Sequence, residues 1–198
     1  KEFVPDSPGA LYLRPTMVGT SSHLGVAPAA EYLFFILANP VGGYFGESFV
    51  DRPASIRIWA TTDFVRAVRG GVGAAKTGGN YAASLRAVKE SKRLGYDNVL
   101  FLDAIGRENI EEMSGMNVFA KFGDTWKTPP IGDTILDGVT RKSIIDLCRE
   151  QNFKVTEENF TIKELTQGAK SGELKEFFAC GTAAAITTIR EIGWQGEN

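Results

Sequence analysis

The chain has 198 residues, with 22 Lys or Arg against 24 Asp or Glu, so its formal charge is −2. Hydrophobic residues make up 43% and charged residues 23%, which is typical of a soluble globular protein with one sizeable core, or one domain plus part of another. The near-neutral charge excludes a broad electrostatic attraction to nucleic acid or anionic lipid. The longest apolar run, residues 32–38, is shorter than the roughly 20 residues that cross a bilayer, and the first residues do not resemble a signal peptide.

Cysteine and histidine are scarce. Cys148 and Cys180 alone can build neither a disulfide framework nor a four-cysteine zinc site, which favours a reducing compartment. His23 is the one histidine, so a multi-histidine metal site is excluded and a Ser-His-Asp triad would have to use that ring. It lies in a loop-like Ser-Ser-His-Leu-Gly segment, where a solvated or capping role is expected. We therefore predict no metal site.

In the first half of the chain, branched and aromatic residues bounded by Gly and Pro predict buried strands. These strands cover residues 11–16 and 32–39. Another short strand is expected at 55–60, and a strand buried on both faces at 98–104. The turn-rich stretch 39–46, together with Asp51-Arg52-Pro53, predicts a linker. A helix is expected from Asn80, its cap, to Leu94, with Gly95 as a left-handed stop.

In the second half, strands and helices alternate without a strict repeat. Strands are expected at 110–112, 116–122, 154–157, 176–180 and 185–190, of which the first two are neighbours joined by a Ser-Gly turn. An amphipathic helix is expected at 139–151. The capping-box spacing of Thr161 and Glu164 predicts the start of another helix. This order of elements favours an α/β or α+β architecture.

The most unusual segment surrounds Lys76. Residues 69–79 hold five glycines, each of which costs chain entropy and permits a positive φ or a close backbone approach to a ligand. One interpretation is the phosphate loop of a nucleotide hydrolase, since residues 70–77 differ from G-x-x-x-x-G-K-[ST] only at Ala75. We rank it second. Ala75 resists the required curl, and Gly78-Gly79 weaken the helical turn that would hold the phosphate.

The other interpretation is an imine-forming lysine. Its amine must be partly neutral and approachable, as in a tight, semi-buried loop. The typical cofactor, pyridoxal phosphate, needs a carboxylate at the pyridine nitrogen, a donor to the ring hydroxyl and a helix N-terminus for its phosphate.

Residues 76–84, Lys-Thr-Gly-Gly-Asn-Tyr-Ala-Ala-Ser, resemble the lysine segment of the branched-chain amino acid aminotransferases, which are pyridoxal phosphate enzymes of fold type IV. Further segments with family counterparts follow the family's order: 11–16, 110–119, 128–130, 138–141 and 179–184. The resemblance covers nearly the whole chain. It implies an α+β, two-domain fold like that of D-amino acid aminotransferase, with an incomplete small domain and a large pseudo-barrel domain.

The same resemblance implies where the domains lie. Residues 1–46 would be the C-terminal part of the small domain, 47–54 the interdomain linker, and 55–198 the large, pyridoxal phosphate-binding domain without its C-terminal end. Family members carry a further N-terminal portion, which supplies a phosphate-binding arginine, and a segment beyond Asn198.

The resemblance also implies the cofactor site. Lys76 would be the catalytic residue, forming an aldimine with the cofactor and carrying the proton at the substrate α-carbon. Glu112 would face the pyridine nitrogen and keep the ring protonated, and strand alternation would turn only one of Glu111 and Glu112 inward. Tyr81 would hydrogen-bond the ring hydroxyl; without the motif it would be a helix-packing aromatic.

The remaining cofactor contacts implied by the resemblance are packing by Leu136 on the ring and an anion site for the phosphate. Val139 and Thr140 lie at a predicted helix N-terminus, whose free N–H groups favour an anion. Thr182 would add its hydroxyl to the same phosphate. Thr140 and Thr182 could instead be plain caps.

For the substrate, the resemblance implies that the turn containing Thr182 and Ala183 takes the carboxylate. Tyr12, Arg14 and Val26 would form the wall of the side-chain pocket. Arg14 would serve a second carboxylate when glutamate replaces leucine; its alternative role is an ion pair beneath the strand.

The implied activity is transamination between L-leucine, L-isoleucine or L-valine and 2-oxoglutarate, by a cytoplasmic homodimer acting in amino-acid biosynthesis without nucleic acid or membrane partners. Three alternatives remain open. They are another fold type IV enzyme (a D-amino acid transaminase or aminodeoxychorismate lyase), the nucleotide hydrolase, and a non-catalytic truncated domain.

Overall fold

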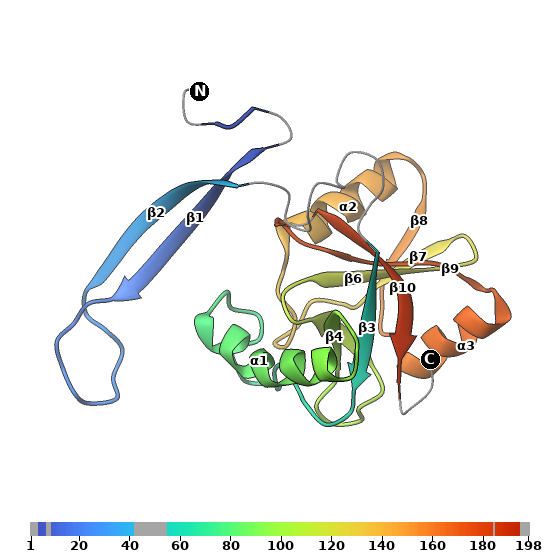
Figure 1. The fold of residues 1–198 in the computed structure, drawn as a ribbon, viewed down its shortest axis with the longest axis horizontal. Helices are drawn as coiled ribbons and strands as arrows, with labels where there is room; N and C mark the ends of the chain where they lie inside the picture. The colour runs from blue at the N-terminus through green and yellow to red at the C-terminus, as the bar shows by residue number, and fades with distance from the viewer. Residues whose placement is uncertain (1–3, 7–8, 42–54, 184, 195–198) are drawn as a thin grey trace. The chain divides into compact units, whose positions relative to one another are not determined.

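The computed structural model describes residues 4–6, 9–41, 55–183 and 185–194 (Figure 1). The chain divides into two units, Lys1–Arg52 and Pro53–Asn198. The linker expected at 47–54 lies outside the described residues.

The first unit is an antiparallel ribbon of β1 (Ala10–Gly19) and β2 (Tyr32–Val41) in one continuous register. Both strands were predicted, but the prediction that they are buried is wrong, because most of their side chains are exposed, Met17 and Phe34 among them. Two strands form a single layer, which offers no second surface to cover them. β2 also runs through the first residues of the predicted turn at 39–46, the rest of which lies outside the described residues.

The second unit is built on an eight-stranded mixed sheet in the order β5-β4-β3-β10-β9-β6-β7-β8. Its strands are β3 (Ser55–Thr61), β4 (Asn98–Leu102), β5 (Ile110–Met113), β6 (Asn117–Phe122), β7 (Thr125–Thr128), β8 (Lys154–Glu157), β9 (Leu174–Cys180) and β10 (Ile186–Gly193). β3 pairs parallel with β4 and β10, and β7 pairs parallel with β8. Every strand expected after residue 54 is present, with ends shifted by a few residues. β7 was missed because its four residues follow closely on β6.

β5 and β6 were expected as neighbours, but they do not pair with each other in the sheet. β5 pairs with β4, whereas β6 pairs with β9 and β7. The Met113 N–H still donates to the Met116 carbonyl at 2.9 Å. The tight turn therefore brings two strands together that stand far apart in the sheet order, and this requires the sheet to curl.

Three helices are described in this unit: α1 (Gly78–Arg93), α2 (Val139–Glu150) and α3 (Ile162–Ser171). α3 opens with the predicted capping box between Thr161 and Glu164. Gly95 has the predicted positive φ, +87°.

The cap predicted for α1 is wrong. Its N-cap is Thr77, and Asn80 lies within the first turn. The Asn80 amide is instead buried and donates to the carbonyls of Val72 and Ala75, both at 2.8 Å. The Asn80 amide thus holds the preceding loop by hydrogen bonds instead of capping the helix.

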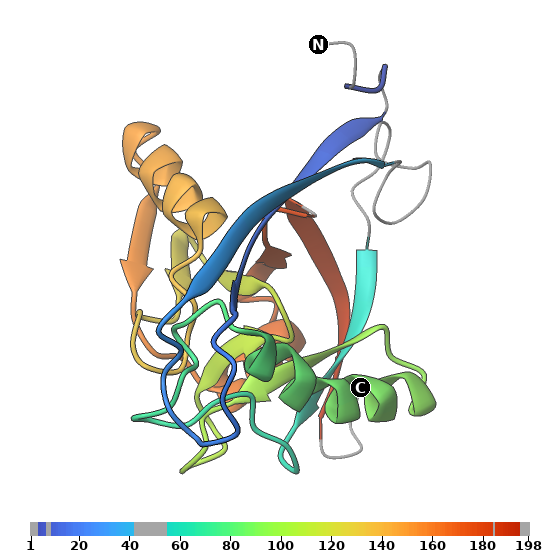
Figure 2. The ribbon, with the colours of Figure 1, turned by 90° about the vertical axis from the view of Figure 1, so that its left-hand side faces the viewer.

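α1 and α2 lie at opposite ends of the sheet, α1 beside β3 and β4 and α2 beside β8 (Figure 2). Ala87 of α1 packs on Val99 and Phe101 of β4, while Ile145 of α2 packs on Phe119 and Phe178. The main core lies within the curl of the sheet, and its fully buried members include Ile58, Leu100, Leu102, Met113, Val118 and Leu165. In the described part of the chain, no helix combines the length and apolar character needed to span a bilayer.

Candidate active site

Lys76 lies in the loop that leads into α1. Its Nζ donates to the hydroxyl of Tyr81, in the first turns of α1, at 2.9 Å, and lies 5.5 Å from the centre of that ring. The Lys76 side chain is exposed, and Gly73 is the one buried residue of 70–76, so the loop is less buried than expected. The amine is oriented by one hydroxyl and stays approachable, as expected.

The loop is packed at Gly73, which is buried against the segment that precedes α2. A Cβ at Gly73 would lie 2.6 Å from the Cα of Thr134 and 2.5 Å from the Cβ of Ala67. The Ala74 N–H also donates to the Asp133 carbonyl at 2.9 Å. Glycine is therefore required here for a close backbone approach, which ties the Lys76 loop to residues 133–136.

The same loop is poorly suited to hold a phosphate. Four of its backbone N–H groups already donate to carbonyls of the protein: those of Gly71, Ala74, Ala75 and Thr77. The sequence argument from Gly78-Gly79 is nevertheless wrong, because α1 begins at Gly78. Packing of the helix on β3 and β4 overrides the low helix propensity of glycine. The structure thus disfavours the phosphate loop because its N–H groups are occupied.

Glu112 is 2% exposed, and three groups hold its carboxylate. Oε1 lies 2.6 Å from Nη1 of Arg66 and accepts from the Leu136 N–H at 3.2 Å, while Oε2 accepts from the Asn117 amide at 3.1 Å. Burial raises the pKa of Glu112 from 4.5 to about 7, although the charges of Arg66 and Lys76 oppose this. The structure therefore brings an acid, poised to titrate near neutrality, within the electrostatic influence of Lys76.

Glu111 departs from the expected alternation, since it is buried as well, at 7% exposure. A hydrogen bond with Thr134 holds its side chain, and burial raises its pKa. β5 is thus covered on both faces, and the segment before α2 provides partners to both acids. Period-two alternation fails here because neither face of this short strand meets solvent.

The N-terminus of α2 is open. Its N-cap is Gly138, so no side chain caps the helix, and no acidic residue lies in the first turn. Thr140 is half-buried and Val139 exposed. A Cβ at Gly138 would collide with Oδ1 of Asn117, whose amide also donates to the Leu136 carbonyl at 2.9 Å. The uncapped N–H groups and the helix dipole together suit an anion.

Thr182 and Ala183 are exposed in the turn between β9 and β10. The turn lies close to the β5–β6 turn, because a Cβ at Gly181 would be 3.6 Å from the Gly115 carbonyl. A Cβ at Gly115 would in turn be 3.5 Å from the Tyr81 ring. The close approaches at Gly181 and Gly115 therefore place the Thr182 turn near the β5–β6 turn, and the β5–β6 turn near Tyr81.

The three pocket residues expected in the first unit are described within that unit alone. Nη2 of Arg14 donates to the Tyr12 hydroxyl at 2.8 Å, and its guanidinium lies 5.1 Å from the centre of the Tyr12 ring. Val26 is fully exposed in the loop between β1 and β2. Their part in a substrate pocket stays a prediction.

Sequence reasoning missed Arg66 and Asn117. An arginine is usually exposed, and no spacing relates Arg66 to Glu112. Asn117 follows the β5–β6 turn closely, and its polar side chain at the start of an apolar strand was the one available signal.

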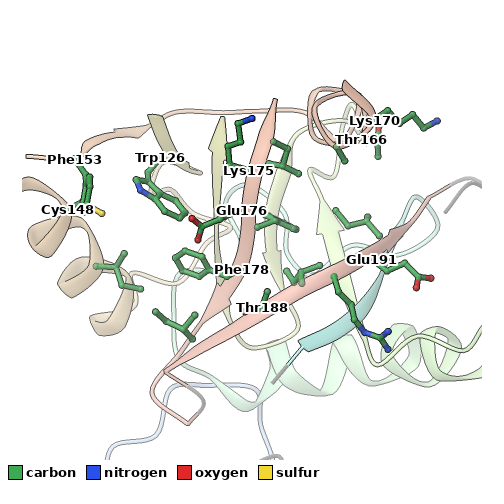
Figure 3. Close-up of a pocket in the computed structure, with 18 of the residues that line it drawn as sticks. Trp126, Cys148, Phe153, Thr166, Lys170, Lys175, Glu176, Phe178, Thr188 and Glu191 are labelled. Carbon is green, nitrogen blue, oxygen red and sulfur yellow. The ribbon is translucent and has the colours of Figure 1, made fainter. Parts of the chain in front are cut away.

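A cavity of about 750 Å³ lies elsewhere, on the face of the sheet between α2 and α3 (Figure 3). Its lining includes Trp126, Phe178, Cys148 and Thr188. Neither Lys76 nor Glu112 lines it, so it is separate from the candidate site.

A family model described as amino-transferase class IV matches residues 3–192, and the chain therefore belongs to the class IV aminotransferases. It is 43% identical over 198 residues to branched-chain-amino-acid transaminase 1 of Bacillus subtilis, covering 100% of this chain and 55% of the relative. It is 45% identical over 202 residues to a probable branched-chain-amino-acid aminotransferase of Streptomyces coelicolor, covering 98% and 55%. The chain spans about half the length of these relatives.

Solved structures of aminotransferases have a fold similar to that of this chain. The branched-chain amino acid aminotransferase of Escherichia coli superposes with a TM-score of 0.80 at 32% identity, covering 96% of this chain and 59% of that one. An aminotransferase from Brucella abortus bound to the cofactor PLP gives a TM-score of 0.77 at 25% identity, covering 94% and 62%. The predicted fold type IV architecture and the family resemblance are confirmed.

Proposed function

We propose that this chain is the greater part of a pyridoxal phosphate-dependent aminotransferase that moves the amino group between L-leucine, L-isoleucine or L-valine and 2-oxoglutarate. The observation that carries the proposal is that the hydrogen-bonded pair of Lys76 and Tyr81 lies close enough to the buried Glu112 for the charge of Lys76 to act on it. The three residues come from a loop, a helix and a strand. The names of the relatives support the choice of substrate class.

The residues present fit this cofactor. Glu112 offers a buried carboxylate for the pyridine nitrogen, Tyr81 a hydroxyl for the ring hydroxyl, and the open N-terminus of α2 a place for the phosphate. Leu136 would pack on the ring. When bound, pyridoxal phosphate supplies the carbonyl that takes up the amino group and a ring that accepts negative charge.

The protein's own side chains would have separate roles in the reaction. The Lys76 amine moves the proton at the substrate α-carbon, and the Tyr81 hydroxyl orients that amine. Glu112, when ionised, holds a proton on the ring nitrogen. Val139, Thr140 and Thr182 would hold the phosphate.

For the substrate, we infer that the Thr182–Ala183 turn binds the carboxylate and that Tyr12, Arg14 and Val26 form the side-chain pocket. An apolar pocket discriminates only modestly among Val, Leu and Ile, because one methylene is worth about 1–3 kcal/mol. Residues 1–46 and 55–198 would belong to the small and large domains of a cytoplasmic homodimer.

Borohydride reduction of the full-length protein, followed by peptide mapping, tests the cofactor assignment. A pyridoxyl adduct is expected on the Lys76 peptide and should be lost in Lys76→Ala. Lys92→Ala, an exposed lysine in the last turn of α1, should keep the adduct. An adduct on another lysine, or none, contradicts the proposal.

A substrate panel tests the reaction. Activity on L-leucine with 2-oxoglutarate is expected. Activity on D-alanine without activity on L-leucine would instead identify a D-amino acid transaminase.

A further inference from the structure

Arg66 is a buried arginine for which the proposed reaction has so far assigned no role. Its side chain is 4% exposed, and its Nη1 lies 2.6 Å from Oε1 of Glu112. The same nitrogen donates to the Thr134 carbonyl at 2.7 Å and to the Gly73 carbonyl at 3.2 Å. One guanidinium therefore contacts three segments: β5, the residues before α2, and the loop that carries Lys76.

Those three segments hold the groups that the cofactor needs. Glu112 lies on β5, Thr134 immediately precedes the stretch that ends at the open N-terminus of α2, and Gly73 is three residues from Lys76. Burial of a guanidinium is costly unless it is paired and hydrogen-bonded. The ion pair with Glu112 and the two hydrogen bonds of Nη1 offset part of that cost, although the buried Nε has no partner among the described residues.

Charges other than Arg66 also act on Glu112. Glu111, its neighbour on β5, raises the pKa of Glu112, whereas Lys76 lowers it. Cys180 of β9 also interacts with Glu112, and burial raises the pKa of that thiol to about 12. Arg66 makes the one close ion pair with Glu112 among the described residues. Without Arg66, the groups that still favour the ionised form of Glu112 would be the Leu136 N–H, the Asn117 amide and the charge of Lys76.

We propose that Arg66 is a positioning residue for the reaction: it favours the ionised form of the Glu112 carboxylate and fixes its direction, and it ties the Lys76 loop to the segment that leads into α2. The catalytic part of this inference rests on the proposed function. The control of Glu112 ionisation by Arg66 stands independently of it.

The first test measures the ionisation of Glu112 in the full-length protein without cofactor. Infrared difference spectra across a pH titration report the carboxylic acid band, which Glu112→Gln assigns by its loss. Arg66→Met should move the midpoint of that band upward by about one pH unit or more. Arg93→Met, an exposed arginine in the last turn of α1, is the control and should leave it unchanged. An unchanged midpoint in Arg66→Met overturns the inference.

The second test measures turnover of the cofactor-loaded protein. Arg66→Met should lower kcat by about tenfold or more and weaken cofactor retention, with KM for L-leucine little changed. Arg66→Lys keeps the charge, but its ammonium ends a shorter side chain than the guanidinium nitrogen that makes all three contacts. Arg66→Lys should therefore keep the infrared midpoint of the wild type but only part of the wild-type kcat. It is the variant to measure if Arg66→Met does not fold. Wild-type kcat in both Arg66 variants overturns the positioning role.

The two proposals fail differently. If no adduct forms on Lys76 while Arg66→Met still shifts the Glu112 midpoint, the proposed function fails and the ionisation control holds. If the adduct forms but neither Arg66 variant changes the midpoint or kcat, only the inference fails.

Discussion

Glu112 has a fixed position in the site, but nearby charges can change its ionisation. It is almost fully buried, yet both carboxylate oxygens have partners, so its position is determined while its ionisation is not. Because burial raises its pKa to about 7, a small change in nearby charge decides whether it is ionised at neutral pH. A cation at the ring nitrogen would favour the ionised form.

The raised pKa predicts a pH-dependent stability of the cofactor-free protein. Between pH 4.5 and 7 the folded state holds a proton that the unfolded state has released, so the contribution of Glu112 to stability falls as pH rises. The difference between 4.5 and about 7 corresponds to about 3 kcal/mol. Glu112→Gln should remove this loss, as measured by urea unfolding at pH 5 and pH 8.

Glu150→Gln, at an exposed end of α2, is the control and should behave like the wild type. The same decline in stability in Glu112→Gln as in the wild type would show that Glu112 is not the group responsible.

At the scale of elements, the close approach of the Lys76 loop to residues 133–136 decides how the amine is presented. Gly73→Ala should lower the free energy of unfolding by about 1–3 kcal/mol, because the added methyl meets backbone at Thr134. Gly78→Ala meets nothing within 4 Å and lies in the first turn of α1. It should be neutral or stabilise by up to about 1 kcal/mol. Denaturant melts of both variants measure the difference, and equal effects would refute it.

Local patterns predicted most elements of the second unit. The capping box at Thr161 and the positive φ of Gly95 are determined by neighbouring residues, and both were predicted. The start of α1 was not, because Asn80 serves the preceding loop rather than capping the helix. Errors of this kind arise where hydrogen bonds of a side chain to the preceding loop compete with capping of the helix.

At the scale of the whole chain, the two units differ in how they are stabilised. The second unit has a core within its curled sheet, whereas the described part of the first is a two-stranded ribbon with exposed apolar side chains. A synthetic peptide covering residues 4–41 should therefore be largely unfolded in water. Narrow amide proton dispersion in its NMR spectrum is expected. Well-dispersed, slowly exchanging amides would contradict this.

By itself the sequence determined the order of the elements apart from β7, the family, and the lysine, tyrosine and glutamate on which the proposed activity rests. These are matters of local spacing and of residue type. The tertiary structure decided that Glu111 is buried beside Glu112, that β5 and β6 do not pair, and that Arg66 reaches the acid from a loop 46 residues earlier in the chain. Each of these depends on the curl of the sheet, which brings together segments that no local pattern relates.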